Sequence, residues 1–203
     1  MSEIIKSEAV VLSKLNYGES SSIVTLYTKE RGKISVILKG GRSPKSKISL
    51  IVDPLNYLEV IIYSKLTREI QVLTGAEIRG HFHKIKEDLD KLKYAHSVIE
   101  LIKSLTVEHE VNQKLFSGIV RILEVMEGGA EDPAVQFGRF FLFFLKESGY
   151  ELQMNKCASC GKTNLKNQEL SYSFENGILC SDCRRNYLED YGINPNFSII
   201  SHV

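Results

Sequence analysis

The four cysteines of this 203-residue chain constrain its structure more than any other feature. They occur as two Cys-x2-Cys pairs, Cys157 with Cys160 and Cys180 with Cys183, and 19 residues separate the pairs. Each pair can form a tight turn that points two sulfurs at one position, and two such turns supply the tetrahedral thiolate set of a structural Zn²⁺ ion. The spacing therefore predicts one structural zinc ion per chain, bound by these four cysteines.

Two other chemistries compete with this interpretation. A thiol–disulfide pair needs only one Cys-x2-Cys motif, so it leaves the second pair unexplained. A zinc-dependent enzyme needs an open coordination position for water, and four thiolates leave none. We therefore expect a four-cysteine zinc module over residues 153–183, in which the metal stabilises a segment that has too few apolar residues to fold alone.

No segment of the sequence is typical of export or of membrane insertion. The most apolar run, Phe140 to Leu145, is six residues long, whereas a membrane-spanning helix takes about 20. The first eight residues include two acidic side chains and no apolar region before a cleavage site, unlike a secretory signal. We expect a cytoplasmic protein that meets no membrane and whose thiols are reduced, which favours metal binding over disulfides.

Residues 1–80 are expected to form a small β-barrel. β-branched and aromatic residues occur in five runs separated by turn residues, which predicts strands at 2–15, 22–28, 33–39, 55–63 and 68–74. Strand counting alone leaves three architectures open, namely an OB-type barrel, an SH3-like barrel and a small sandwich.

From residue 81 onward the apolar residues follow a helical period, which predicts an α-helical domain over residues 81–152 together with part of 184–203. The last helix before the cysteines has Asp132 as a plausible N-cap, Pro133 in its first turn and Gly149 at its C-terminal end. Four of the nine phenylalanines lie within residues 140–144, so we expect protein on most sides of this helix. An exposed phenylalanine there would instead mark a pocket for a partner.

The net charge of +1 conceals an uneven distribution. Residues 1–80 contain 12 basic and 8 acidic residues, whereas residues 81–203 contain 14 basic and 17 acidic ones. Within the predicted barrel, residues 29–47 hold seven basic residues and one acidic residue. Such clustering suits a phosphate backbone, because each cation that meets a phosphate releases a condensed counterion. The predicted DNA contacts are Lys29, Arg31, Lys33, Lys39, Arg42, Lys45 and Lys47.

Tyrosines 17, 27, 57 and 63 lie on or beside the predicted strands and are candidates for stacking on bases, although barrel tyrosines are more often part of a core. The glycines at 40 and 41 do not continue into a phosphate-binding loop, and nothing in the sequence is typical of a nucleophile elbow or of an H-E-x-x-H zinc site. We therefore expect no catalytic residue and no enzymatic activity.

Residues 17–32 (YGESSSIVTLYTKERG), followed by Leu38 to Arg42 with Lys45 and Ser46, resemble the N-terminal barrel of the bacterial recombination mediator RecO family. The stretch from Phe140 to Tyr150 that leads into Cys157 is similar to the helix-to-zinc junction of that family. The resemblance implies an α+β multidomain chain with an OB-fold barrel, an α-helical domain and a four-cysteine zinc module in that order.

The same resemblance implies DNA repair by recombination. A member of this family is expected to bind single- and double-stranded DNA, to anneal complementary strands and to act with RecR. It is also expected to engage single-stranded-DNA-binding protein, to help load RecA and to associate with the nucleoid. The alternative is a zinc-containing structural adaptor that binds acidic protein partners without direct DNA contact, since a basic loop serves either function.

Overall fold

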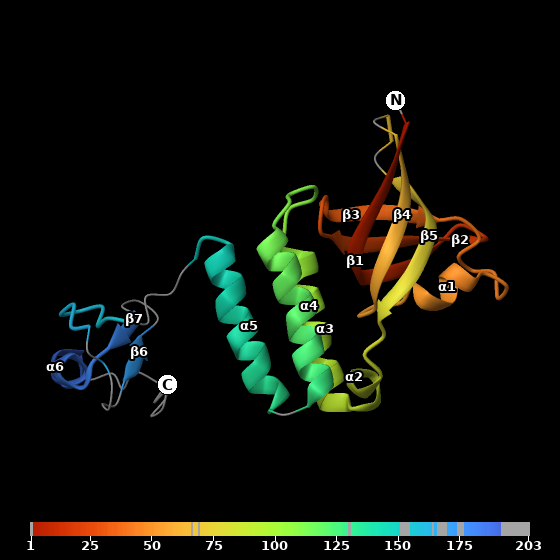
Figure 1. Ribbon diagram of the computed structural model, residues 1–203. Helices are drawn as coiled ribbons and strands as arrows, with labels where there is room; N and C mark the ends of the chain where they lie inside the picture. The colour runs from red at the N-terminus through yellow and green to blue at the C-terminus, as the bar shows by residue number, and fades with distance from the viewer. Residues whose placement is uncertain are drawn as a thin grey trace. The chain divides into compact units, whose positions relative to one another are not determined.

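The computed structural model describes residues 2–65, 67–68, 70–129, 131–150, 155–163, 165, 170–173 and 177–191. The chain divides into two compact units, Met1–Glu147 and Ser148–Val203 (Figure 1). The first contains a barrel and the helices α1 to α5, and the second contains the cysteines. The predicted subdivision into domains at residues 1–80, 81–152 and 153–183 stays a prediction.

Five strands form a closed barrel in the order β1-β2-β3-β5-β4. These strands are β1 (Ser2–Tyr17), β2 (Ser21–Thr28), β3 (Gly32–Leu38), β4 (Tyr57–Lys65) and β5 (Gln71–Gly80). Neighbouring strands are antiparallel except β3 and β5, whose parallel pairing closes the barrel through Val36↔Gln71 and Ile37↔Val72. This confirms the expected OB-type barrel.

The bounds of all five strands differ from the prediction, and one helix was not predicted. The fourth strand begins at Tyr57 because Leu55 has a positive φ of 73°, which is a turn conformation. The fifth strand, predicted at 68–74, runs from Gln71 to Gly80. A short helix that was not predicted, α1 (Lys47–Ile51), follows the loop after β3 and begins at the N-cap Ser46.

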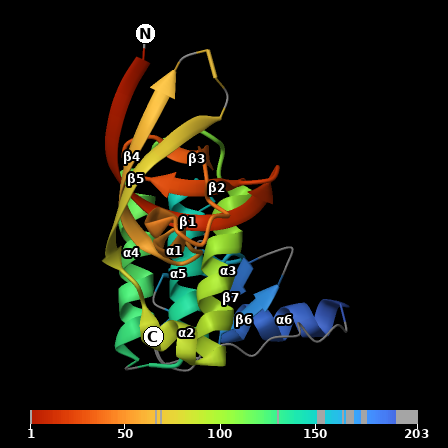
Figure 2. The same cartoon turned by 90° about the vertical axis from the view of Figure 1, so that its right-hand side faces the viewer.

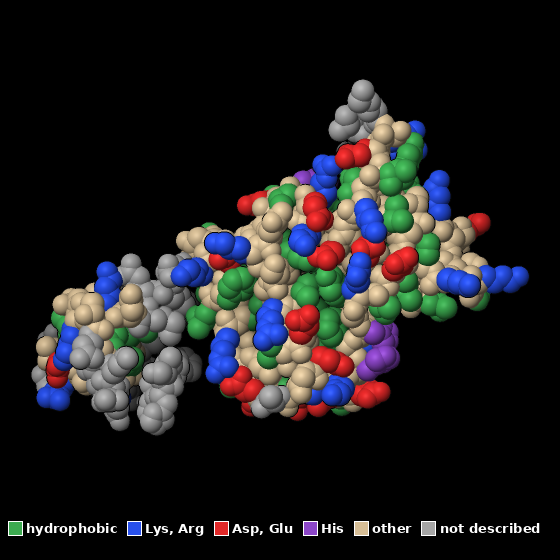
Figure 3. Space-filling model, in the orientation of Figure 1, with side chains coloured by type: hydrophobic (Ala, Val, Ile, Leu, Met, Phe, Trp, Pro, Cys, Tyr) green, Lys and Arg blue, Asp and Glu red, His purple; other side chains and the backbone are tan. Residues whose placement is uncertain are grey.

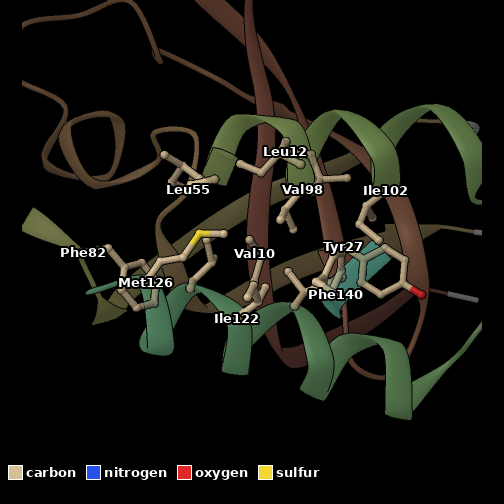
Figure 4. Packing of buried hydrophobic residues seen from close by; sticks show 14 of the residues in the cluster. Val10, Leu12, Tyr27, Leu55, Phe82, Val98, Ile102, Ile122, Met126 and Phe140 are labelled. Carbon is tan, nitrogen blue, oxygen red and sulfur yellow. The ribbon is translucent and has the colours of Figure 1, made fainter. Parts of the chain in front are cut away.

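Strand β1 contributes to two hydrophobic cores, because successive side chains of a strand point to opposite faces of the sheet. Ala9 and Val11 lie in the core inside the barrel. Val10 and Leu12 lie in a second core, which the outside of the barrel shares with the helices. Figure 4 shows this second core, where barrel residues meet side chains of the helices. The shared core explains why barrel and helices form one unit.

Four helices follow the barrel in the first unit, namely α2 (His83–Glu87), α3 (Leu89–Leu105), α4 (Gln113–Gly128) and α5 (Pro133–Glu147). The side chains of Asp88 and Asn112 accept backbone hydrogen bonds at the N-termini of α3 and α4. Asp132 does the same for α5, accepting from the backbone N–H of Ala134 at 2.8 Å. Figure 1 places α3 and α4 between the barrel and α5.

Helix α5 buries one side against α3 and α4, where Phe140 and Phe144 are 4% and 2% exposed. Its other side carries Val135, Phe141 and Leu142, which are all exposed. The expectation of protein on most sides of this helix is therefore wrong within residues 1–147. The phenylalanines are divided between a buried face and an exposed one.

The second unit contains a two-stranded antiparallel sheet, β6 (Ser171–Ser173) with β7 (Gly177–Leu179), and the helix α6 (Ser181–Tyr191) (Figure 2). Part of residues 184–203 was expected to belong to the helical domain, and residues 192–203 of this stretch lie outside the described residues. Among the residues that are described, no helix is long and apolar enough to cross a bilayer.

Candidate metal centre and nucleic-acid interface

The four cysteine sulfurs form one cluster in which all Sγ atoms lie within 4.8 Å of one another. The Sγ atoms of Cys160 and Cys180 are 3.8 Å apart. Four ligands at the usual Zn–S distance of about 2.3 Å, arranged as a tetrahedron, place neighbouring sulfurs about 3.8 Å apart. The cluster therefore has the size and the donor set for one four-coordinate metal ion, and an all-sulfur set suits Zn²⁺.

Backbone hydrogen bonds hold the first Cys-x2-Cys turn in shape. The N–H of Gly161 donates to the carbonyl of Cys157 at 2.9 Å, and the N–H of Cys157 donates to the carbonyl of Lys162 at 2.9 Å. Gly161 has a φ of 73°, a conformation that side-chain-bearing residues rarely adopt. The N–H of Ala158 donates to the carbonyl of Ile178 at 2.7 Å, which attaches this turn to β7.

The second Cys-x2-Cys pair begins directly after β7 and continues into α6. The backbone N–H of Cys180 donates to the sulfur of Cys157 at 3.4 Å, a contact that joins the two pairs. An ion pair between Lys162 and Asp182, with 3.8 Å from Nζ to Oδ2, joins them a second time at the surface. Short-range turn geometry and the β6–β7 pairing thus bring together residues that 19 positions separate in sequence.

The pKa values of two cysteines show that the cluster favours some negative charge but not four thiolates at once. Burial disfavours the thiolate of Cys157, but the backbone hydrogen bonds of Cys160, Cys180 and Ser159 outweigh burial and lower its pKa to about 6. Ser159 favours the thiolate of Cys183, yet burial and the neighbouring sulfurs outweigh this contact and raise its pKa to about 12. A bound divalent cation removes this conflict, because it favours deprotonation of every ligand.

The predicted basic segment 29–47 does not form a single surface. Lys29 and Arg31 lie in the turn between β2 and β3, whereas Lys39 follows the opposite end of β3. Since β3 is seven residues long, about 20 Å separates its two ends. The hairpin therefore divides the seven predicted contacts into two groups.

At the β2–β3 turn, Lys29 and Arg31 form ion pairs within the barrel. The Nζ of Lys29 pairs with Glu8 at 3.0 Å, and the guanidinium of Arg31 pairs with Glu3 at 3.0 Å. Each cation is thus partly neutralised by a carboxylate of β1. Neither is retained in the candidate interface.

Lys33 has a structural role in place of the predicted phosphate contact. It is only 9% exposed, and its Nζ donates to the carbonyl of Lys103 at 2.7 Å and to the carbonyl of Thr106. These carbonyls lie at the C-terminal end of α3, where a cation is favourable. Lys33 therefore attaches the barrel to the helices, and its prediction as a DNA contact is corrected.

The second group, Lys39, Arg42, Lys45 and Lys47, gathers at one end of the barrel. All four side chains are exposed, and none forms an ion pair with any residue that the structure describes. Lysine and arginine side chains project from the side of the barrel that carries α1 (Figure 3). This group, which we name the barrel-end cluster, is the candidate site for phosphates.

Hydrogen bonds fix the loop that carries the barrel-end cluster. The guanidinium of Arg42 donates to the carbonyl of Gly18 at 2.6 Å, and its backbone N–H donates to the carbonyl of Ser20 at 3.0 Å. The Nζ of Lys14 donates to the carbonyl of Ser49 at 2.7 Å, within α1. The loop is thus attached to the β1–β2 turn and to β1 itself.

The four candidate tyrosines lie in different surroundings. Tyr27 is 1% exposed in the core shared with the helices, and burial, with a smaller contribution from Glu110, raises its pKa to about 12. Tyr57 contacts Phe116 edge-on at a centroid distance of 6.3 Å, and the ammonium of Lys65 lies 5.7 Å from the ring of Tyr63. Tyr17 is 55% exposed and is the one that adjoins the barrel-end cluster, since it precedes Gly18.

Sequence reasoning missed an open apolar surface beside the barrel-end cluster. Leu15, Ile23 and Ile37 pair across β1, β2 and β3 and therefore share the outer face of the barrel with Tyr17. Leu15 is 64% exposed, while Ile23 and Ile37 are half-buried. The helices cover the other half of this face, where Tyr27 lies. The sequence signal for this surface was the alternation of apolar and polar residues in the strands before and after Gly18.

Comparison with known proteins matches both halves of the chain to one family. The model for the N-terminal domain of recombination protein O matches residues 1–82, and the model for its C-terminal domain matches residues 86–198. Three curated relatives are each called DNA repair protein RecO. The relative from Alkaliphilus metalliredigens is 32% identical over 180 residues, which cover 89% of this chain and 72% of the relative.

The other two relatives are covered less completely. The protein from Chlorobium phaeobacteroides is 33% identical over 162 residues, which cover 80% of this chain and 62% of the relative. The protein from Salinibacter ruber is 37% identical over 120 residues, which cover 59% of this chain and 46% of the relative. The chain thus spans less than two thirds of the length of these two relatives.

Proposed function

Because the chain belongs to the recombination protein O family, we propose that it is a DNA repair and recombination mediator. In this proposal it binds single- and double-stranded DNA and anneals complementary strands. With RecR it helps to load RecA onto strands covered by single-stranded-DNA-binding protein. It works in the cytoplasm, in association with the nucleoid, and it makes or breaks no covalent bond.

The observation that carries DNA binding is the barrel-end cluster. Four exposed cations without a carboxylate partner among the described residues are available to phosphates, whereas Lys29 and Arg31 pair with carboxylates of β1. Each phosphate contact gains free energy mainly because it releases condensed counterions. Binding should therefore weaken steeply as the salt concentration rises.

The open half of the outer face supports contact with bases beside this phosphate site. OB-type barrels bind oligonucleotides on the face of their second and third strands and through adjoining loops. Here that face presents the apolar row Leu15, Ile23 and Ile37 next to the exposed ring of Tyr17. Stacking on an aromatic ring contributes about 1–3 kcal/mol per base in single-strand binders.

Annealing follows from electrostatics in this proposal. Two complementary strands repel each other through their phosphates, and a cationic surface lowers that repulsion while it raises the local concentration of both strands. Base pairing then provides the free energy of the reaction, so no catalytic residue is required.

We assign a structural Zn²⁺ ion to the four cysteines. The sulfur separation of 3.8 Å between Cys160 and Cys180 and the all-thiolate donor set support zinc. Among the residues of this unit that the structure describes, the buried core is small, and two of its members are the ligands Cys157 and Cys180. The metal therefore stabilises the fold of the second unit, and four protein ligands leave no position for substrate.

We assign protein partners to the helical part of the first unit. The exposed side of α5 presents Val135, Phe141 and Leu142, and the rings of Phe137 and Phe141 stack at a centroid distance of 6.3 Å. Exposed apolar surface of this kind is typical of interaction sites. Because this surface is separate from the barrel-end cluster, one chain can bind DNA and a protein partner at the same time.

A fluorescence titration of the purified protein with a labelled, partner-free oligonucleotide tests the proposal. We expect saturable binding that weakens as salt is added. The adaptor alternative predicts no binding to the oligonucleotide at any salt concentration and retention of acidic protein partners. A metal assay on the same preparation should find one zinc ion per chain, and its absence would overturn the zinc assignment without affecting the DNA result.

A further inference from the structure

The four cysteines of the cluster are not equally accessible. Cys157 and Cys180 are each 1% exposed, and both belong to the small buried core of the second unit. Cys183 is half-buried, whereas Cys160 is exposed. Cys160 is therefore the most accessible of the four ligands, Cys183 is partly accessible, and Cys157 and Cys180 are shielded by protein.

This asymmetry matters because metal binding keeps cysteine in the thiolate form, which is the form that peroxides oxidise. Oxidation selects thiolates that solvent can reach. We propose that Cys160 is a peroxide-sensitive modification site, a proposal that rests on the zinc-loaded state of the proposed function. Buried Cys157 and Cys180 are protected from direct attack by the residues that pack around them.

The position of Cys180 provides the second step. In the first step the sulfur of Cys160 attacks one oxygen of hydrogen peroxide, the O–O bond breaks, and the products are a sulfenic acid and hydroxide. The Cys180 sulfur, 3.8 Å away, then attacks the sulfur of Cys160. An S–S bond forms, the S–O bond breaks and a second hydroxide leaves, so two thiolates are oxidised and one peroxide is reduced to two hydroxide ions.

The disulfide removes one ligand from each Cys-x2-Cys pair. Only Cys157 and Cys183 then remain as thiolates, and two ligands are too few for a structural zinc site, so the module loses its ion. The new bond still joins the two turns that the metal had joined. A thiol reductant and fresh zinc should therefore restore the original state, which makes the site a reversible sensor of peroxide.

The test uses the full chain after its zinc content has been measured. Hydrogen peroxide is added with a reagent that traps sulfenic acids, and the labelled cysteines are identified by peptide mass spectrometry. A chromogenic chelator follows zinc release in parallel. We expect trapping at Cys160 before any other cysteine and, without the trap, one Cys160–Cys180 disulfide for each zinc ion released.

The variant Cys160→His provides the matched control, because histidine replaces one cysteine in many structural zinc sites and has no sulfur to oxidise. We expect this variant to retain zinc at peroxide concentrations that release it from the parent protein. First trapping at Cys157, Cys180 or Cys183, or equal release from both proteins, would overturn the proposal. If the variant fails to bind zinc, the order of trapping in the parent protein decides the question alone. A parent protein without zinc would instead refute the metal assignment itself.

Discussion

Replacing Lys33 by methionine tests whether this lysine holds the barrel on the helices. Methionine keeps the unbranched apolar part of the side chain and removes the ammonium group. That group donates to the carbonyls of Lys103 and Thr106, and hydrogen bonds of charged groups contribute about 1.5–3 kcal/mol each. Because the buried ammonium also has a desolvation cost, we expect a net loss of about 2–4 kcal/mol from the free energy of unfolding.

Thermal or urea unfolding, followed by circular dichroism, measures this loss. At about 2–4 °C per kcal/mol for a chain of this size, the melting temperature should fall by about 4–16 °C. Lys39→Met is the matched control, since Lys39 is exposed at the other end of β3. It should leave stability unchanged and weaken binding to DNA, whereas Lys33→Met should keep the salt dependence of DNA binding. A stable Lys33→Met protein that has lost DNA affinity would refute the structural role.

Three further predictions concern the backbone at two glycines, the titration of His81 and the proposed zinc site. Gly32→Ala should cost more than about 3 kcal/mol, because Gly32 has a φ of 64° and an added Cβ would lie 2.0 Å from a backbone oxygen of the α3–α4 loop. Gly18→Ala, at φ 58° with open space around it, should cost about 1–2 kcal/mol in the same unfolding assay. Burial, and to a smaller extent neighbouring positive charges, lower the pKa of His81 in the folded protein. The neutral imidazole therefore contributes stability above the unfolded pKa of about 6.5, and this contribution is lost as the pH falls from there through the lowered folded-state pKa. His81→Gln should make stability fall less steeply between neutral and acid pH, and an unchanged profile would contradict this. Cys157→Ser combined with Cys160→Ser should abolish zinc binding and lower the melting temperature of the second unit, as a metal assay and calorimetry can show.

The four-cysteine cluster was predictable because the information that specifies it is local in sequence. Each Cys-x2-Cys pair specifies one turn, and the spacing alone indicates that the two turns share a metal. The observed cluster has all four sulfurs within 4.8 Å. The spacing does not predict how exposed each cysteine is, because the exposure depends on how β7 and the residues around Cys180 pack.

The basic segment shows where sequence reasoning fails. Counting charges treats residues 29–47 as one patch, but a seven-residue strand separates Lys29 from Lys39. The burial of Lys33 depends on carbonyls about 70 positions further along the chain, and no local pattern reports them. Tyr27 is similar, because helices far away in sequence cover it. Long-range packing thus buries Lys33, and ion pairs with β1 engage Lys29 and Arg31, so the proposed phosphate contacts are the four residues of the barrel-end cluster.

The salt dependence of single-strand binding tests the central claim most directly. The variant with Lys39→Glu, Arg42→Glu and Lys45→Glu loses three phosphate contacts, so the slope of log affinity against log salt should decrease in magnitude by about 2, at about 0.7 per contact. The charge-matched control reverses Lys84, Lys93 and Lys114, which are exposed on the helices, and should keep the parent slope. An unchanged slope in the barrel variant, or an equal loss in the helix variant, would contradict DNA binding by the barrel-end cluster.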